Sequence, residues 1–177
     1  DHWALVVSPP ERVDWPLSPR EQRALGVALE AKGRFADAYA AYQQAGPSGG
    51  VTDLFLGNAL LGQGRFAEAG SAFEAHLALH PESAEAANNL AWTIMRGGAD
   101  AVRAEKLVRD ARPRSEALHP YLLDTLSQIQ AARGDRAGAL STVEAALAEV
   151  GEGDRALAGA LAFHRGELLL AMGRPEE

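Results

Sequence analysis

A pattern of leucine, small and bulky apolar residues recurs along most of the chain. In each copy a leucine precedes a small residue, a glycine follows several positions later, and an alanine and then a bulky apolar residue usually come after the glycine. The copies start at Leu25-Gly26, Leu56-Gly57, Leu90-Ala91 and Leu126-Ser127, and a partial copy surrounds Gly166. They follow one another at intervals of roughly 35 residues, and a regular period in this range indicates an array of stacked structural repeats.

Each copy predicts two helices that meet at its glycine. The apolar and small residues of the first segment lie three and four positions apart, which is the spacing of one helix face. Glycine tolerates the positive φ of a helix end. Because one such hairpin cannot bury its apolar face alone, we expect the hairpins to stack. The predicted helices cover residues 20–32, 35–46, 51–63, 66–79, 84–96, 100–111, 119–133, 136–149 and 154–172.

Residues 1–18 do not follow the repeat. Residues 3–7 form a short apolar run that ends at a Ser-Pro-Pro segment, and this pattern predicts a buried strand. A single strand is unstable alone, so this one would need a sheet from outside the repeats. Ser18 is suited to cap the first helix, with Glu21 placed for a capping box. We therefore predict an N-terminal extension over residues 1–18 and a helical domain over residues 19–177.

The joint register of the copies resembles the tetratricopeptide-repeat (TPR) family over residues 19–177. The resemblance implies an all-α fold, a right-handed α-solenoid of about four and a half TPR helical hairpins. In that family the small residue of the first helix lets the second helix approach closely. The first helices line a concave groove that binds proteins or peptides.

The resemblance also implies the groove residues, position by position. They are Leu54, Asn58 and Leu61 in the second copy, Asn88, Trp92 and Met95 in the third, Tyr121, Asp124 and Gln128 in the fourth, and Phe163 and Glu167 in the partial copy. Amides can bond to the backbone of an extended peptide, and aromatic rings can hold its side chains. For Leu54 and Leu61, packing against a neighbouring helix is the alternative interpretation.

The N-terminal extension is similar to the junction in bacterial proteins that join a papain-like, bacteriocin-processing-type cysteine peptidase domain to TPR repeats. Residues 88–92 and 123–126 are similar to the repeats of those proteins as well. This resemblance implies that residues 2–7 are the last strand of such a peptidase domain, whose nucleophile lies upstream, and that the repeats recruit its substrates or assembly partners. It further implies a place in the bacterial cytoplasm or cell envelope, with the envelope favoured.

Composition excludes several kinds of chemistry. The formal net charge of −7 disfavours binding to nucleic acid, and the absence of cysteine excludes disulfides and thiolate sites. No apolar run reaches the ~20 residues that span a bilayer. His76 and His80 could face one metal ion, but zinc needs three or four ligands, so we expect His76 to have a packing role. We predict no catalytic residue, no metal site and no cofactor.

The sequence thus predicts a non-catalytic scaffold that binds a protein or an extended peptide. The last predicted helix carries Leu168, Leu169, Leu170 and Met172. Because uncapped solenoid ends expose apolar surface, we expect this face to be covered by further chain or by self-association with a second copy.

Overall fold

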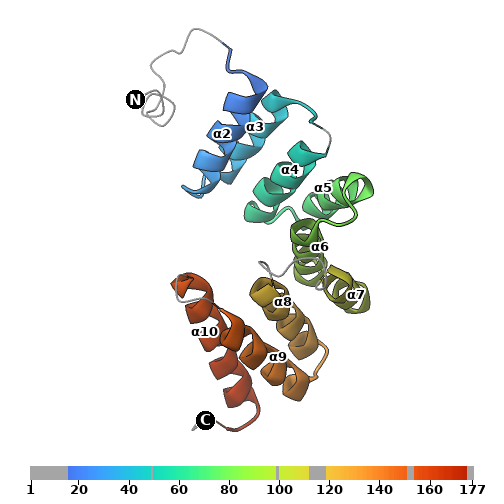
Figure 1. Ribbon diagram of the computed structural model, residues 1–177, viewed down its shortest axis with the longest axis vertical. Coiled ribbons are helices and arrows are strands. Elements are labelled where there is room, and N and C mark those ends of the chain that lie inside the picture. Colours follow the sequence, from blue (N-terminus) through green and yellow to red (C-terminus); the bar gives the residue numbers. More distant parts are fainter. Residues whose placement is uncertain (1–15, 49, 99, 112–118, 151–153, 175–177) are drawn as a thin grey trace. The chain divides into compact units, whose positions relative to one another are not determined.

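The computed structural model describes residues 16–48, 50–98, 100–111, 119–150 and 154–174 (Figure 1). The chain divides after Pro81 into two compact units. Among the described residues all regular elements are α-helices, and no strand occurs. The predicted strand over residues 3–7 lies outside the described residues.

The first unit consists of α2 (Pro19–Glu30), α3 (Phe35–Ala45), α4 (Val51–Gly62) and α5 (Phe66–Leu79). Helices α2 and α3 form one hairpin, α4 and α5 form another, and α3 packs against α4 between them. A capping box begins α2: the Ser18 hydroxyl accepts from the backbone N–H of Glu21, and the Glu21 carboxylate accepts from the backbone N–H of Ser18 at 2.8 Å. The predicted helix cap is therefore confirmed.

Small residues let the helices of this unit approach closely. Gly26 on α2 faces the ring of Tyr42 on α3, and Gly57 on α4 faces the ring of Phe73 on α5, so a Cβ at either glycine would overlap the ring. Both rings are fully buried, and Tyr42 also stacks on Phe55, with ring centroids 5.1 Å apart. Burial, followed by the neighbouring Glu30 carboxylate, raises the pKa of the Tyr42 hydroxyl. The same small-to-large pairing therefore closes both hairpins of this unit.

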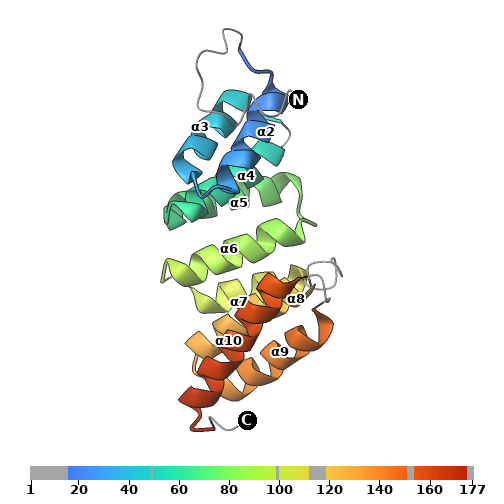
Figure 2. The ribbon, with the colours of Figure 1, turned by 90° about the vertical axis from the view of Figure 1, so that its left-hand side faces the viewer.

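The second unit consists of α6 (Ala84–Arg96), α7 (Ala101–Ala111), α8 (His119–Ala132), α9 (Arg136–Glu149) and α10 (Arg155–Ala171). Helices α6 and α7 form one hairpin, and α8 and α9 form the next, with α7 against α8 and α6 also against α8. Helix α10 packs against α9 and also contacts α8 (Figure 2). Helix α8, the first helix of its hairpin, therefore contacts both α6 and α10 directly.

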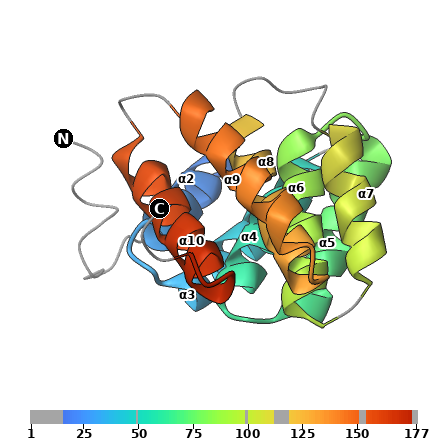
Figure 3. The same cartoon turned by 90° about the horizontal axis from the view of Figure 1, so that it is seen from below.

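Leucines and small residues from three helices form the core of the second unit. This cluster consists of Leu123, Ala139, Leu140, Val143, Ala146, Leu157, Leu161, Leu168 and Leu169. Leu168 and Leu169 of α10 are thus buried, whereas Leu170 is 67% exposed. Only part of the apolar end of α10 (red in Figure 3) is therefore uncovered in this unit.

The predicted helices agree with the observed ones to within two residues at each end. The glycines between paired helices adopt the expected turn, with φ of 72° at Gly64 and 88° at Gly134. No helix among the described residues has both the length and the apolar character that crossing a membrane requires.

Candidate functional site

Three helices of the second unit each present one face to an open pocket. Side chains at positions i, i+3, i+4 and i+7 lie on one side of a helix, and the lining of α8 and α10 follows this spacing. The lining residues are Met95 from α6, Asp124, Gln128 and Ala131 from α8, and Ala160, Phe163, His164 and Glu167 from α10. The free volume is about 360 Å³, near the lower end of the ~300–1,000 Å³ typical of ligand pockets. It therefore suits a few side chains rather than a whole domain.

Asp124 is the polar centre of this pocket. Its Oδ2 accepts a hydrogen bond of 3.0 Å from Nε2 of Gln128, one turn further along α8. Its Oδ1 lies 3.4 Å from Nδ1 of His164 on α10. The side chains of His164 and Asp124 are only 14% and 20% exposed. The carboxylate is therefore held in a fixed position between two helices.

The rim of the pocket combines an exposed ring with an unpaired carboxylate. Phe163 is 69% exposed, although it is one of the largest apolar side chains in the unit. Glu167 is exposed and forms no hydrogen bond or ion pair with any residue that the structure describes. The described lining contains two carboxylates, from Asp124 and Glu167, and neither lysine nor arginine. The pocket therefore offers negative charge beside an aromatic surface.

Contacts with α9 hold α8 and α10, the two helices that contribute most of the pocket lining. Ser127 is fully buried on α8, and its hydroxyl donates a hydrogen bond of 2.7 Å to the carbonyl of Ala139 on α9. Arg165 of α10 donates through Nε to Glu144 on α9 at 3.1 Å. The positive charge of Arg165 is therefore paired with a carboxylate of α9.

Tyr121 does not line the pocket, although the sequence predicts it as a groove residue. Its hydroxyl donates to the carboxylate of Asp154, which also caps α10 by accepting from the backbone N–H of Leu157. These two bonds hold the pKa of Asp154 below its ordinary value, and the bond to Asp154 raises the pKa of Tyr121. Tyr121 thus anchors the start of α10.

Other predicted groove residues lie elsewhere on the first helices. Trp92 of α6 is half-buried, and the guanidinium of Arg96 lies over its ring at 5.1 Å from the centroid. Asn88 is half-buried and bonds through Nδ2 to Oδ1 of Asn89 at 3.5 Å. Leu54, Asn58 and Leu61 are half-buried on α4 of the first unit. The pocket thus brings together Met95, Asp124, Gln128, Phe163 and Glu167 of the predicted set.

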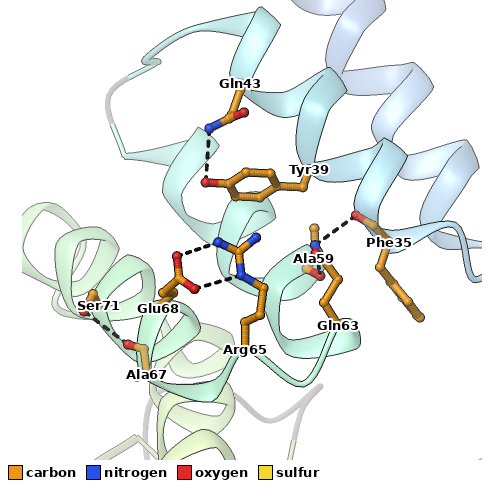
Figure 4. A network of polar contacts seen from close by, with 9 residues as sticks. All are labelled: Phe35, Tyr39, Gln43, Ala59, Gln63, Arg65, Ala67, Glu68 and Ser71. Carbon is orange, nitrogen blue, oxygen red and sulfur yellow. Dashed lines mark hydrogen bonds and ion pairs between the residues drawn. The ribbon is translucent and has the colours of Figure 1, made fainter.

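The first unit has a polar network of its own at the α3–α4–α5 junction (Figure 4). Arg65 donates through Nε to Glu68 at 2.8 Å and lies over the ring of Tyr39 at 5.2 Å from the centroid. Gln63 donates to the carbonyl of Phe35 at 3.3 Å and so links α4 to α3. All these groups pair with one another, and the network therefore stabilises the junction rather than presenting a site.

The two histidines of α5 have a structural arrangement. His76 is buried, and its Nδ1 lies 2.9 Å from the carbonyl oxygen of Gly50. The rings of His76 and His80 are 4.8 Å apart. Within the described ranges, no three potential metal ligands lie together. His76 therefore ties α5 to the turn before α4.

Sequence reasoning missed His164, Ala131 and Ala160 as pocket residues. The spacing could have found them: His164 lies three positions before Glu167, and Ala160 lies three before Phe163, on the same helix face. Ala131 lies three positions after Gln128 on the face that also carries Asp124. The pairing of Asp124 with His164 had no local signal, since the two belong to different copies of the repeat.

The comparisons with known proteins agree with this architecture. Residues 56–117 match the family model for the tetratricopeptide repeat. A thermophilic TPR protein of Thermus thermophilus has a TM-score of 0.76 at 21% identity, covering 88% of this chain and 84% of that chain. BtubC (BKLC) from P. vanneervenii has a TM-score of 0.73 at 20% identity, covering 89% and 74%. Pseudomonas aeruginosa pilF has a TM-score of 0.73 at 15% identity, covering 88% of this chain and 69% of that chain.

No curated protein matches the sequence significantly. Structural likeness at these identities shows the fold, and the family match shows the repeat within it. The predicted fold class is therefore confirmed: the described helices form an all-α solenoid of tetratricopeptide-type hairpins.

Proposed function

We propose that this chain is a non-catalytic scaffold whose second unit binds an extended segment of a partner protein. The observation that carries the proposal is the pocket formed by α6, α8 and α10, where a fixed polar centre lies beside an exposed ring. TPR proteins bind protein partners, and the fold and the repeat match support this function at the family level.

The chemistry of the pocket favours an extended chain over a folded surface. Asp124 and Gln128 place adjoining hydrogen-bonding groups in the pocket, and the backbone of an extended peptide offers donors and acceptors to such groups. Met95 and Phe163 provide apolar surface for a neighbouring side chain. A preformed pocket of this kind reduces the ordering cost of binding on the protein side.

Selection from a degenerate octapeptide library tests the proposal. The wild-type protein should enrich a family of related peptides. Ala160→Trp, which places an indole in the pocket, should abolish that enrichment. Ala162→Trp is the matched control, because Ala162 is an exposed alanine of α10 outside the lining. If the wild type enriches nothing, or if both tryptophan variants behave alike, the pocket is not the binding site.

We also propose self-association through one face of α10 as a second property. Gly159, Gly166 and Leu170 share a helix face, and Leu170 is 67% exposed. Apart from the adjoining residues and the backbone of α10 itself, no described atom lies within 4 Å of a Cβ built on Gly166, whereas rings fill the matching space at Gly26 and Gly57. A second copy of α10 is the occupant that we propose for this face.

Sedimentation of the purified chain at increasing concentration tests this second proposal. A dimer should form in the wild type, and Leu170→Glu should remove it. Val102→Glu is the control, because Val102 is 62% exposed on α7, away from α10. A wild type that stays monomeric at high concentration would contradict self-association.

As an alternative, we propose that the repeats serve a papain-like cysteine peptidase of the bacterial cell envelope and recruit its substrates or assembly partners. The support is the apolar run over residues 3–7 with the Ser-Pro-Pro segment behind it. The coding sequence upstream of Asp1 tests this alternative. A cysteine-bearing papain-like segment there supports it, and any other upstream sequence contradicts it.

A further inference from the structure

We infer that the pocket of the second unit selects a cationic side chain, lysine or arginine, from the peptide it binds. The inference rests on the proposed function, because it names the chemistry of the ligand at that same site. It follows from the charge, hydrogen-bonding polarity and aromatic surface of the lining residues.

The polar groups of the pocket are hydrogen-bond acceptors. Carboxylates only accept, and Asp124 and Glu167 contribute two of them. Gln128 uses its Nε2 to donate to Asp124, and that bond leaves its amide oxygen unengaged. A ligand that fits this lining must therefore be rich in donors.

Lysine ammonium and arginine guanidinium groups meet that requirement. They carry three and five N–H donors and no acceptor. The free carboxylate of Glu167 can pair with such a cation without breaking an existing bond, since no described residue occupies it. Arg165 does not neutralise the site, because it is paired with Glu144 on α9.

The exposed ring of Phe163 supplies a second attraction. Its 69% exposure leaves a ring face open at the rim of the pocket that Glu167 also lines. A cation over an aromatic face gains about 0.5–1 kcal/mol at exposed sites. Methylene groups of a lysine or arginine stem can lie against Met95 and Ala160, which are apolar.

Two other ligand classes fit less well. An apolar side chain would remove the Glu167 carboxylate from water without pairing it, which is unfavourable. An acidic side chain would meet two like charges, and the chain as a whole has a formal net charge of −7. Charge complementarity therefore favours a basic segment of a partner protein.

The test compares residue preferences in a degenerate octapeptide library near 0.15 M ionic strength, where surface charges more than ~8 Å apart are screened. With the wild type, lysine or arginine at one position should be preferred over alanine at least about tenfold, a difference of 1.4 kcal/mol. The double variant Asp124→Asn, Glu167→Gln should lose this preference and retain a similar helix content by circular dichroism.

The double variant Glu85→Gln, Asp110→Asn is the charge-matched control. It removes the same formal charge from α6 and α7 at exposed positions outside the lining, leaves the Arg165–Glu144 ion pair in place, and should keep the cationic preference. Peptides enriched without a lysine or arginine preference would overturn the inference and leave peptide binding in place. No enrichment at all would overturn both. A preference lost equally in the control would show a general charge effect and would also overturn the inference.

Discussion

Oδ1 of Asp124 on α8 lies 3.4 Å from Nδ1 of His164 on α10, and both side chains are largely buried. Forty positions separate the two residues in sequence. Their contact joins two walls of the pocket, and the Gln128 amide holds the same carboxylate from the other side. This contact therefore helps to fix the geometry of the pocket across the α8–α10 interface.

A double-mutant cycle measures this contact. Asp124→Ala, His164→Ala and the double variant should show a coupling free energy of about 0.5–1.5 kcal/mol in urea denaturation, the range of one hydrogen bond. If the two single losses add without coupling, the carboxylate does not hold the imidazole in solution.

Alanine substitutions at Gly57 and Gly166 should have opposite effects on the stability of the folded protein. Gly57→Ala should destabilise the protein by about 1–3 kcal/mol, because its Cβ overlaps the buried Phe73 ring. Gly166→Ala lies within α10, where no other described helix comes within 4 Å of the added Cβ, so it should stabilise the protein by up to about 1 kcal/mol through helix propensity. Thermal melts of the pair check this prediction, and an equal loss in both would contradict the packing described here.

Truncation of Trp92 should cost less stability than truncation of Phe73. Phe73 is fully buried, so Phe73→Ala should cost about 3–5 kcal/mol. Trp92 is half-buried, and Trp92→Ala should cost clearly less stability in the same urea melts. Equal losses of stability would mean that Trp92 belongs to the core and not to a binding surface.

The start of α10 should be sensitive to acid. Tyr121 and the Leu157 backbone hold the pKa of Asp154 below its ordinary value of 3.8, so the unfolded chain takes up a proton at higher pH than the folded one. The stabilisation that ionised Asp154 provides is thus complete above pH 3.8 and is lost as the pH falls through the lower pKa that Asp154 has in the folded state. Asp154→Asn should therefore lower the melting temperature at neutral pH and make little difference in strong acid. A melting-temperature difference that does not change with pH would contradict this account.

The sequence was sufficient to predict the helices because each carries its own signals. The spacing around Gly57, the glycine at position 64 and the Ser18–Glu21 cap are all local, and the structure has each of them where the pattern placed it. Even the buried Ser127 follows the small-residue position of its copy.

The pocket was harder to predict from the sequence because it depends on contacts between residues that are far apart along the chain. Register placed Asp124 and Phe163 on first helices, but only the fold brings His164 to Asp124. Tyr121 occupies a groove position by register, yet its hydroxyl meets Asp154 across the chain. Leu168 and Leu169 likewise pack into the core of α8–α10, which the apolar pattern of α10 alone could not show.

The most direct test of the binding site uses the two methionines of the chain as internal probes. Met95 lines the pocket, whereas Met172 packs against the core of the second unit. Methyl NMR spectra of the protein labelled at both methionines should be recorded during titration with the peptide selected from the octapeptide library. We expect the Met95 resonance, assigned with Met95→Leu, to shift and saturate while the Met172 resonance stays in place. A selected peptide that binds and leaves Met95 unmoved would contradict the assignment of the pocket as the binding site.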